Sequence, residues 1–142
     1  MYIGCKGSTN IPASVNTIYP YAFSENLLDN NSIYVSNANI IESNAFYNCE
    51  GLTTIVLNNI KYLNNNSFYN CKSLNNIQLN IVEFPKLFGT NKLAPKGKIY
   101  IPSELINLSS NDYIKFKENI SSYIGYEVGD PNTDLDWTIE SL

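Results

Sequence analysis

The sequence contains no histidine, and this absence removes both the commonest general base and the commonest metal ligand. Charged residues make up only 15% of the chain, the formal net charge is −4, and lysine and arginine form no cluster. Because nucleic-acid-binding proteins normally carry a basic patch, nucleic acid is not an expected partner. No stretch approaches the ~18 consecutive apolar residues of a membrane-spanning helix, so we expect no membrane insertion.

Cysteine and secretory features are scarce as well. Three cysteines are an odd number and too few for a disulfide scaffold. The first residues, Met1 to Lys6, lack the charged leader and the apolar stretch of a secretory signal. From this N-terminal sequence we expect either an intracellular protein or a segment of a larger one.

The motifs of common catalytic sites are missing too. Serine nucleophiles have no histidine base and no Ser-x-x-Lys pair, and the sequence has no glycine-rich phosphate loop. Aspartate and glutamate are spread thinly, so a carboxylate pair for glycoside hydrolysis has no obvious place to form. We therefore expect a protein that is not an enzyme and needs no cofactor.

What the sequence does contain is an internal repeat, in which asparagine, about one residue in six, supplies much of the polarity. Residues 41–57 and 63–79 align without a gap at a shift of 22, with Phe, Tyr, Asn, Cys, Leu, Ile and Leu at matching positions. An earlier copy has one extra residue between Phe23 and Ile33, and a degenerate copy follows the two regular ones. The earlier copy carries Ile18, Ala22, Phe23, Leu28, Ile33 and Val35, and the degenerate copy carries Ile81, Phe84 and Phe88.

The length of the repeat predicts the fold. A period of 22 lies within the range of leucine-rich repeats, roughly 20–29 residues, and Leu52-x-x-Ile55-x-Leu57 has the spacing of their strand. One repeat cannot bury its own apolar side chains, whereas stacking places Phe on Phe and Ile on Ile in a continuous core. We predict a leucine-rich-repeat solenoid of stacked short parallel β-strands, with irregular or short helical connections and a helical C-terminal cap.

Apolar residues near the C-terminus indicate the cap. They recur at helical spacing, and Ser103 and Asn111-Asp112 are plausible helix caps before them. We expect a repeat stack with an N-terminal lead-in over residues 1–102, one or two helices as a cap over residues 103–124, and an acidic tail or linker over residues 125–142. The periodic residues are Tyr113, Phe116, Ile120, Tyr123 and Ile124, and the acidic residues of the tail are Asp130, Asp134, Asp136 and Glu140.

Three stretches carry a family resemblance: residues 11–18, the core Ala45-Phe46-x-x-Cys49-x-x-Leu52-x-x-Ile55, and residues 99–102. Together they resemble the BspA-like leucine-rich repeats of bacterial surface proteins, over about residues 2–124. The chain departs from that family at Ser67, where a small Ala is usual before Phe. The resemblance implies a parallel solenoid, a location at the cell surface or outside the cell, and a role in adhesion or partner binding. It also implies that residues 99–102 lead from the last repeat into the helical cap.

Cys49 and Cys71 occupy the same position in adjacent repeats. Stacked strands lie about 4.8 Å apart, which suits a disulfide by distance, but equivalent side chains point in parallel, which is poor bridge geometry. Without histidine or a Cys-x-x-Cys pair, a zinc site is incomplete. We expect two buried, reduced thiols and no metal, while Cys5 lies outside the repeat with nothing nearby to activate it.

Residues 130–134 begin like a calcium-binding loop, with alternating oxygen-bearing side chains. Calcium loops need glycine at the sixth position and a carboxylate at the twelfth, and these positions hold Leu135 and Ser141. We interpret the segment as a solvated acidic linker.

The outward positions of the expected strands form the candidate binding site, because they alternate with buried Ile and Leu and stack in two columns on one face. Three strands of about three residues give a patch of about 150–200 Å², whereas a standard protein interface buries about 800 Å² per partner. Binding by a single domain should therefore be weak, and the same face can equally be a solvated surface. The candidate residues are Ser32, Tyr34, Thr54, Val56, Asn76 and Gln78.

We expect the chain to be a non-catalytic binding or adhesion module that presents its repeat surface to a protein or glycan partner, as part of a larger surface protein. The first alternative is a structural spacer or attachment domain of a cell-surface or phage fibre, with no ligand of its own. A second alternative is an accessory domain of an enzyme.

Overall fold

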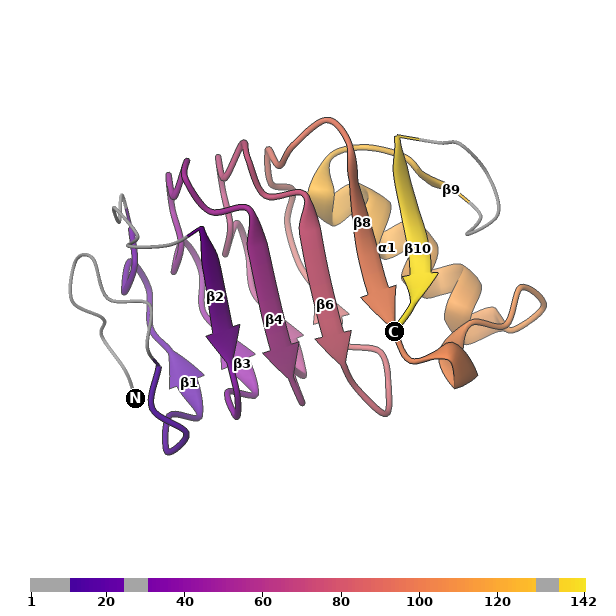
Figure 1. The fold of residues 1–142 in the computed structure, drawn as a ribbon, viewed down its shortest axis with the longest axis horizontal. Coiled ribbons are helices and arrows are strands. Elements are labelled where there is room, and N and C mark those ends of the chain that lie inside the picture. Colours follow the sequence, from indigo (N-terminus) through magenta and orange to yellow (C-terminus); the bar gives the residue numbers. More distant parts are fainter. Residues whose placement is uncertain (1–10, 25–30, 130–135) are drawn as a thin grey trace.

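The chain winds as a coil whose turns build two parallel β-sheets around one core (Figure 1). The computed structural model describes residues 11–24, 31–129 and 136–142. The larger sheet has the order β2-β4-β6-β8-β10-β9, and the smaller sheet has the order β1-β3-β5-β7. The strands of the larger sheet are β2 (Ser32–Val35), β4 (Thr54–Asn58), β6 (Asn76–Asn80), β8 (Gly97–Ile101), β10 (Trp137–Ser141) and β9 (Val128–Gly129), and those of the smaller sheet are β1 (Thr17–Ile18), β3 (Ile40–Ile41), β5 (Tyr62–Leu63) and β7 (Lys86–Leu87).

The pairing register reproduces the period of the sequence and confirms the predicted solenoid of stacked parallel strands. In the larger sheet Ile33 pairs with Ile55, Ile55 with Ile77, and Ile77 with Ile99, always 22 residues apart. From β2 to β8 the connections between the strands are turns and irregular segments, as expected.

The degenerate copy of the repeat departs from this register in the smaller sheet. There Leu63 pairs with Leu87, 24 residues later, so two extra residues lie in the turn between β6 and β7. Val82 in that turn is 88% exposed. Leu87, and not Phe88, occupies the inward position of the repeat, and Phe88 is exposed. The insertion therefore moves this inward position by two residues from Pro85, where the 22-residue period would place it.

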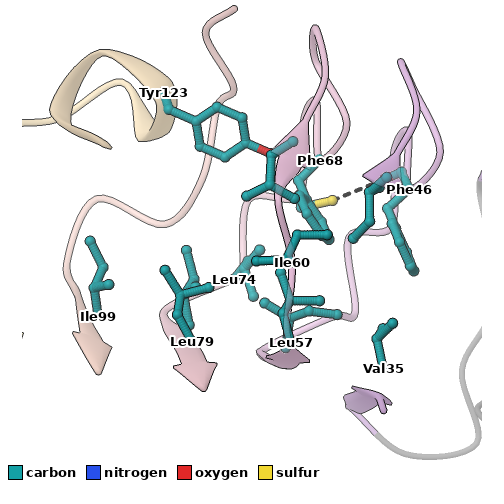
Figure 2. Close-up of a cluster of buried hydrophobic side chains, with 14 of the residues drawn as sticks. Val35, Phe46, Leu57, Ile60, Phe68, Leu74, Leu79, Ile99 and Tyr123 are labelled. Carbon is teal, nitrogen blue, oxygen red and sulfur yellow. Dashed lines mark hydrogen bonds between the residues drawn. The ribbon is translucent and has the colours of Figure 1, made fainter. Parts of the chain in front are cut away.

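A ladder of phenylalanine rings runs through the core along the stack. The ring centroids of Phe23 and Phe46 are 5.0 Å apart and those of Phe46 and Phe68 are 4.8 Å apart, with nearly parallel ring planes. All three side chains are buried, which confirms the register predicted from the sequence. Figure 2 shows Phe46 and Phe68 side by side, with Leu57 and Leu79 pointing into the same core from the larger sheet.

Asparagine shapes the turns between the strands. Asn44 and Asn66 occupy one repeat position and Asn48 and Asn70 another, and all four have φ between 58° and 64°. This left-handed region is strained for most residues, but asparagine tolerates it because its short side chain can form local hydrogen bonds. Gly89, with φ of 79°, lies close to Asn66 of the first pair. The abundance of asparagine therefore has a conformational cause as well as supplying polarity.

A helical cap closes one end of the core, as predicted. It consists of the 3₁₀ turn η1 (Ser103–Leu105) and the helix α1 (Asn111–Ile124), which contacts β7 and β9. Ser110 is the N-cap residue, and its side chain accepts a hydrogen bond from the Tyr113 backbone N–H at 3.4 Å. The helix ends at Gly125, whose φ is 89°. The five apolar residues at helical spacing are all buried: Tyr113, Phe116, Ile120, Tyr123 and Ile124.

Polar side chains join α1 to the end of the phenylalanine ladder. Asn91, which is fully buried, accepts a hydrogen bond from the Phe68 backbone N–H at 3.0 Å and donates one from Nδ2 to the Tyr123 carbonyl at 3.0 Å. The hydroxyl groups of Ser67 and Tyr123 are hydrogen-bonded to each other. Ser67, at the position where the family resemblance implies Ala, therefore has a hydrogen-bond partner in the cap. In Figure 2 Tyr123 enters the core from α1.

The C-terminal residues differ from the expected acidic tail or linker. Residues 137–141 form β10, which pairs with β8 over five residues and lies between β8 and β9. Trp137 is fully buried, and its Nε1 donates a hydrogen bond to the Ala94 carbonyl at 2.8 Å. The ring lies against Gly97, where an added Cβ would be 2.7 Å from it.

The acidic composition of this region led to the prediction of a linker instead of a strand. In β10, Trp137 and Ile139 are buried and alternate with polar residues. Residues 136–142 are thus not loosely attached to the fold. The calcium-like segment 130–134, Cys5 and the lead-in before residue 11 lie outside the described residues.

Candidate binding face

The candidate residues lie together on the outer face of the larger sheet. Their inward neighbours Ile33, Ile55 and Ile77 are buried, while the candidate side chains are exposed or half-buried. The strand register aligns them in two rows that cross the strands. One row contains Ser32, Thr54 and Asn76, and the other contains Tyr34, Val56 and Gln78.

Two further strands extend these rows beyond the six predicted residues. In β8, Lys98 pairs with Asn76 and Tyr100 pairs with Gln78. In β10, Glu140 pairs with Tyr100 and is half-buried, whereas the neighbouring Thr138 is buried.

These residues were not predicted from the sequence, because β8 follows the degenerate repeat and β10 lies in the segment expected to be a tail. One signal was available, since Ile99 follows Ile77 by the same 22 residues that separate the earlier strands.

A chain of side-chain hydrogen bonds links the C-terminal ends of strands β2, β4 and β6. Asn80 Nδ2 donates to Asn58 Oδ1 at 2.5 Å, and Asn58 Nδ2 donates to the Tyr34 hydroxyl at 3.0 Å. Tyr34 is nevertheless 55% exposed. A phenol that accepts one hydrogen bond still carries its own proton as a donor. The chain of bonds therefore positions the hydroxyl group of Tyr34 and leaves both the ring and this donor accessible.

The two sheets differ in the charge of their outer faces. The outward positions of β2, β4 and β6 carry no charged side chain, and charge begins only with Lys98 and Glu140. On the smaller sheet, Lys86 Nζ lies 5.8 Å from the centre of the Tyr62 ring. The Glu42 carboxylate, just after β3, accepts a hydrogen bond from Asn64 at 2.9 Å. Strands β2, β4 and β6 of the larger sheet thus present a neutral polar surface, and the smaller sheet does not.

The two repeat cysteines are buried and form no disulfide, as predicted. The Cys49 thiol donates to the Phe23 carbonyl at 2.8 Å, and the Cys71 thiol donates to the Phe46 carbonyl at 3.0 Å. Burial raises the pKa of the Cys71 thiol well above its usual value, and the neighbouring Cys49 raises it further. The Cys71 thiol is therefore a poor nucleophile, because the thiolate is the reactive form. The hydrogen bonds of both thiols tie successive turns of the coil together.

A cleft of about 570 Å³ lies where the β6–β7 turn meets η1 and α1. Its floor contains Phe84 and Phe116, whose rings stack with centroids 4.5 Å apart. Three carboxylates and two amino groups line it, so it has no strong charge of either sign to select a ligand. The charged residues are Glu83, Glu104, Asp112, Lys86 and Lys115.

The described parts of the chain contain neither a candidate metal site nor a candidate membrane span. Across residues 11–24, 31–129 and 136–142, histidine, cysteine and carboxylate side chains form no group of three that could hold a metal ion. Within the same ranges, no helix has both the length and the apolar character required to cross a membrane.

Comparison with known proteins gives one match. The family model of the BspA-type leucine-rich repeat region matches residues 4–117, with six copies of the repeat. The match includes every strand from β1 to β8 and reaches into α1, so it covers most of the candidate binding face. No curated protein and no solved structure matches the chain.

Proposed function

The chain belongs to the BspA-type leucine-rich-repeat family, and from this we propose that it is a non-catalytic binding or adhesion module of a larger surface protein. The family indicates a module for protein interaction or surface display. The expected place of action is the cell surface or the extracellular space, and the expected partner is a protein or a glycan. The part that contacts the partner is the outer face of the larger sheet.

The observation that supports this proposal is the continuity of the face. Strands β2, β4, β6, β8 and β10 lie in one sheet, so their outward side chains form unbroken rows from Tyr34 to Glu140. Five strands about 4.8 Å apart, each presenting about five residues, give an area of about 400 Å². This is roughly twice the area expected from the sequence. It is still only half of a standard protein interface, so each domain should bind weakly.

A structural spacer with no ligand is the alternative function. The Asn80–Asn58–Tyr34 hydrogen bonds favour it, because they link neighbouring repeats and would stiffen a rod whether or not the face binds a partner. The two functions differ in one measurable respect, since only a binding module loses activity when exposed side chains on this face are removed.

The test is a binding experiment with the domain displayed as a tetramer on a protein and glycan array, because multivalent display compensates for weak single-site affinity. The double variant Tyr34→Ala, Gln78→Ala should lose binding, whereas its stability should change by less than about 0.5 kcal/mol per site, as is usual for surface positions. Tyr62→Ala, which removes an exposed tyrosine from the smaller sheet, is the matched control and should bind normally.

Two results would count against the proposal. Normal binding by the double variant would mean that the outer face is only a structural scaffold and does not contact the partner. A tetramer that binds no component of the array would favour the spacer.

A further inference from the structure

We infer that the ligand of the outer face is a neutral oligosaccharide that lies across strands β2 to β8. This inference rests on the proposed function and names the chemical class of its partner. Size, charge, hydrogen-bonding groups and rigidity of the face support it.

The size of the face favours a narrow ligand. An area of about 400 Å² is half of what a specific protein partner buries on each side. An extended sugar chain is narrower than the strands are long, so it can make all its contacts within this area. Along the row from Tyr34 to Tyr100 the face crosses four strands, a distance of about 14 Å. A short oligosaccharide spans this distance.

The charge of the face favours a neutral ligand. The eight outward positions of β2, β4 and β6 contain hydroxyl, amide, phenol and aliphatic side chains, and none is charged. Over these three strands a sulfated or carboxylated ligand would lose its hydration without gaining a cation in return. The only cation in the two rows is Lys98, which lies at one edge of this neutral area. These positions are Ser32, Tyr34, Thr54, Val56, Asn58, Asn76, Gln78 and Asn80.

The hydrogen-bonding groups match those of sugar hydroxyls. A sugar hydroxyl both donates and accepts, and each amide side chain offers an NH₂ donor next to a carbonyl acceptor. Amide side chains lie next to one another on β4 and β6, at Asn58, Asn76, Gln78 and Asn80. Tyr34 and Tyr100 lie on either side of this amide cluster, and a tyrosine offers an apolar ring face together with a polar tip. The rings can cover the C–H surface of a sugar while the amides pair with its hydroxyls.

The face is also ordered before any ligand binds. The bonds from Asn80 to Asn58 and from Asn58 to Tyr34 hold three of its side chains, and Gln78 Nε2 donates to Asn76 Oδ1 at 3.3 Å. Side chains that are already ordered lose less conformational entropy on binding. A weak polar ligand such as a sugar gains most from this arrangement, because it brings little apolar area of its own.

The experiment is a titration of the purified domain with neutral hexose oligosaccharides, from disaccharide to hexasaccharide, alongside sulfated and uronic-acid oligosaccharides of the same lengths. Isothermal titration calorimetry measures the affinities at low and high salt. Affinity for the best neutral series should rise with length and then level off once the chain reaches from Tyr34 to Tyr100. It should change by less than about twofold with salt, because no ion pair is formed.

Single variants locate the site. Tyr34→Ala and Tyr100→Ala should each weaken oligosaccharide binding by about tenfold or more, as expected for aromatic anchors. Tyr62→Ala on the smaller sheet should leave the affinity unchanged. Circular dichroism melting of each variant checks that the fold is intact, and Tyr34→Phe, which keeps the ring but removes the hydroxyl, should lose less affinity than Tyr34→Ala.

The outcomes separate this inference from the proposed function. Binding of charged oligosaccharides only, with steep salt dependence, would overturn the inference, and so would neutral binding that is unchanged by both tyrosine variants. If no sugar binds but a protein ligand depends on Tyr34 and Gln78, the sugar inference fails and the binding function stands. If no ligand of either class depends on this face, both fail.

Discussion

The regular repeats and the C-terminal end of the molecule are built on different principles. In the repeats, each side chain packs on its own counterpart one turn away, as Phe23, Phe46 and Phe68 do. At the C-terminal end, unlike residues meet once only, as Trp137 meets Gly97 and Ser67 meets Tyr123. The first kind of contact can be inferred from a period, whereas the second requires a structure, because no spacing in the sequence links the partners.

The largest expected effect comes from the C-terminal end. Trp137→Ala removes a fully buried ring and its hydrogen bond to the Ala94 carbonyl, and should lower the free energy of unfolding by about 3–5 kcal/mol. Denaturant unfolding measures this change. Leu142→Ala, at a position that is 50% exposed and directly after β10, is the control and should be nearly neutral. If both variants were equally stable, β10 would be a loosely attached tail after all.

Phe46→Ala is the corresponding change in the repeats. It removes the central ring of the ladder, which stacks on both Phe23 and Phe68, and should also lower stability by about 3–5 kcal/mol. Thermal melting followed by circular dichroism measures the loss, with Val82→Ala at an exposed position as the control. A loss below about 1 kcal/mol would contradict a tightly stacked ladder.

A smaller effect is expected where the two regions meet. Asn91→Leu keeps a similar volume but leaves the buried Phe68 backbone N–H without its acceptor, which should cost about 1–3 kcal/mol. Chemical denaturation of the variant beside Asn75→Leu, an exposed asparagine, measures the difference. Equal stability of the two variants would show that the hydrogen bonds of Asn91 are not what joins α1 to the ladder.

The smallest effect at neutral pH concerns the thiols, which gain no charge until the solution is alkaline. In the unfolded chain a cysteine ionises near ~8.5, whereas burial keeps Cys71 protonated in the folded protein because its pKa is raised. The unfolded state therefore binds fewer protons as the pH rises above ~8.5, and the free energy of unfolding should fall there. Tyr123, whose pKa is also raised by burial, should add to this loss above ~10, where a free tyrosine ionises.

The measurement is urea unfolding between neutral and alkaline pH, combined with thiol labelling of a Cys5→Ser variant that leaves only the two repeat cysteines. Labelling of Cys49 and Cys71 should be slow in the native protein and fast in urea. Rapid native labelling, or stability that does not fall with rising pH, would contradict the burial of these thiols.

The sequence was sufficient for the parts of the molecule in which one residue type recurs. The 22-residue shift placed Phe46 in the core and Ile55 in a strand, and the alternation around Ile55 placed Thr54 and Val56 on the outer face. Helical spacing placed Phe116 and Tyr123 in the cap for the same reason. A periodic pattern is informative because each copy confirms the others.

The features that were not predicted depend on single contacts that no repeating sequence pattern indicates. Lys98 and Tyr100 extend the rows of the candidate face, but the two extra residues in the turn before β7 interrupt the repeat pattern ahead of β8, although β8 itself keeps the 22-residue spacing from β6. Trp137 lies in a strand whose surroundings are acidic and contain Gly129 and Pro131, residues typical of linkers. Burial of Trp137 depends on Gly97, which lies against its ring, and no spacing in the sequence links the two residues.

The contact between Gly97 and Trp137 determines where this molecule can grow. A new copy of residues 41–62, inserted after the original, would meet the same neighbours on both sides that the existing copies meet. A duplicate of the coil that contains β8 would set a second Gly97 in the sheet with no tryptophan to fill the space beside it. We therefore expect gene duplication to add copies of the central repeats but not of the last turn. Descendants of this chain should differ in the number of central repeats and share the same C-terminal turn.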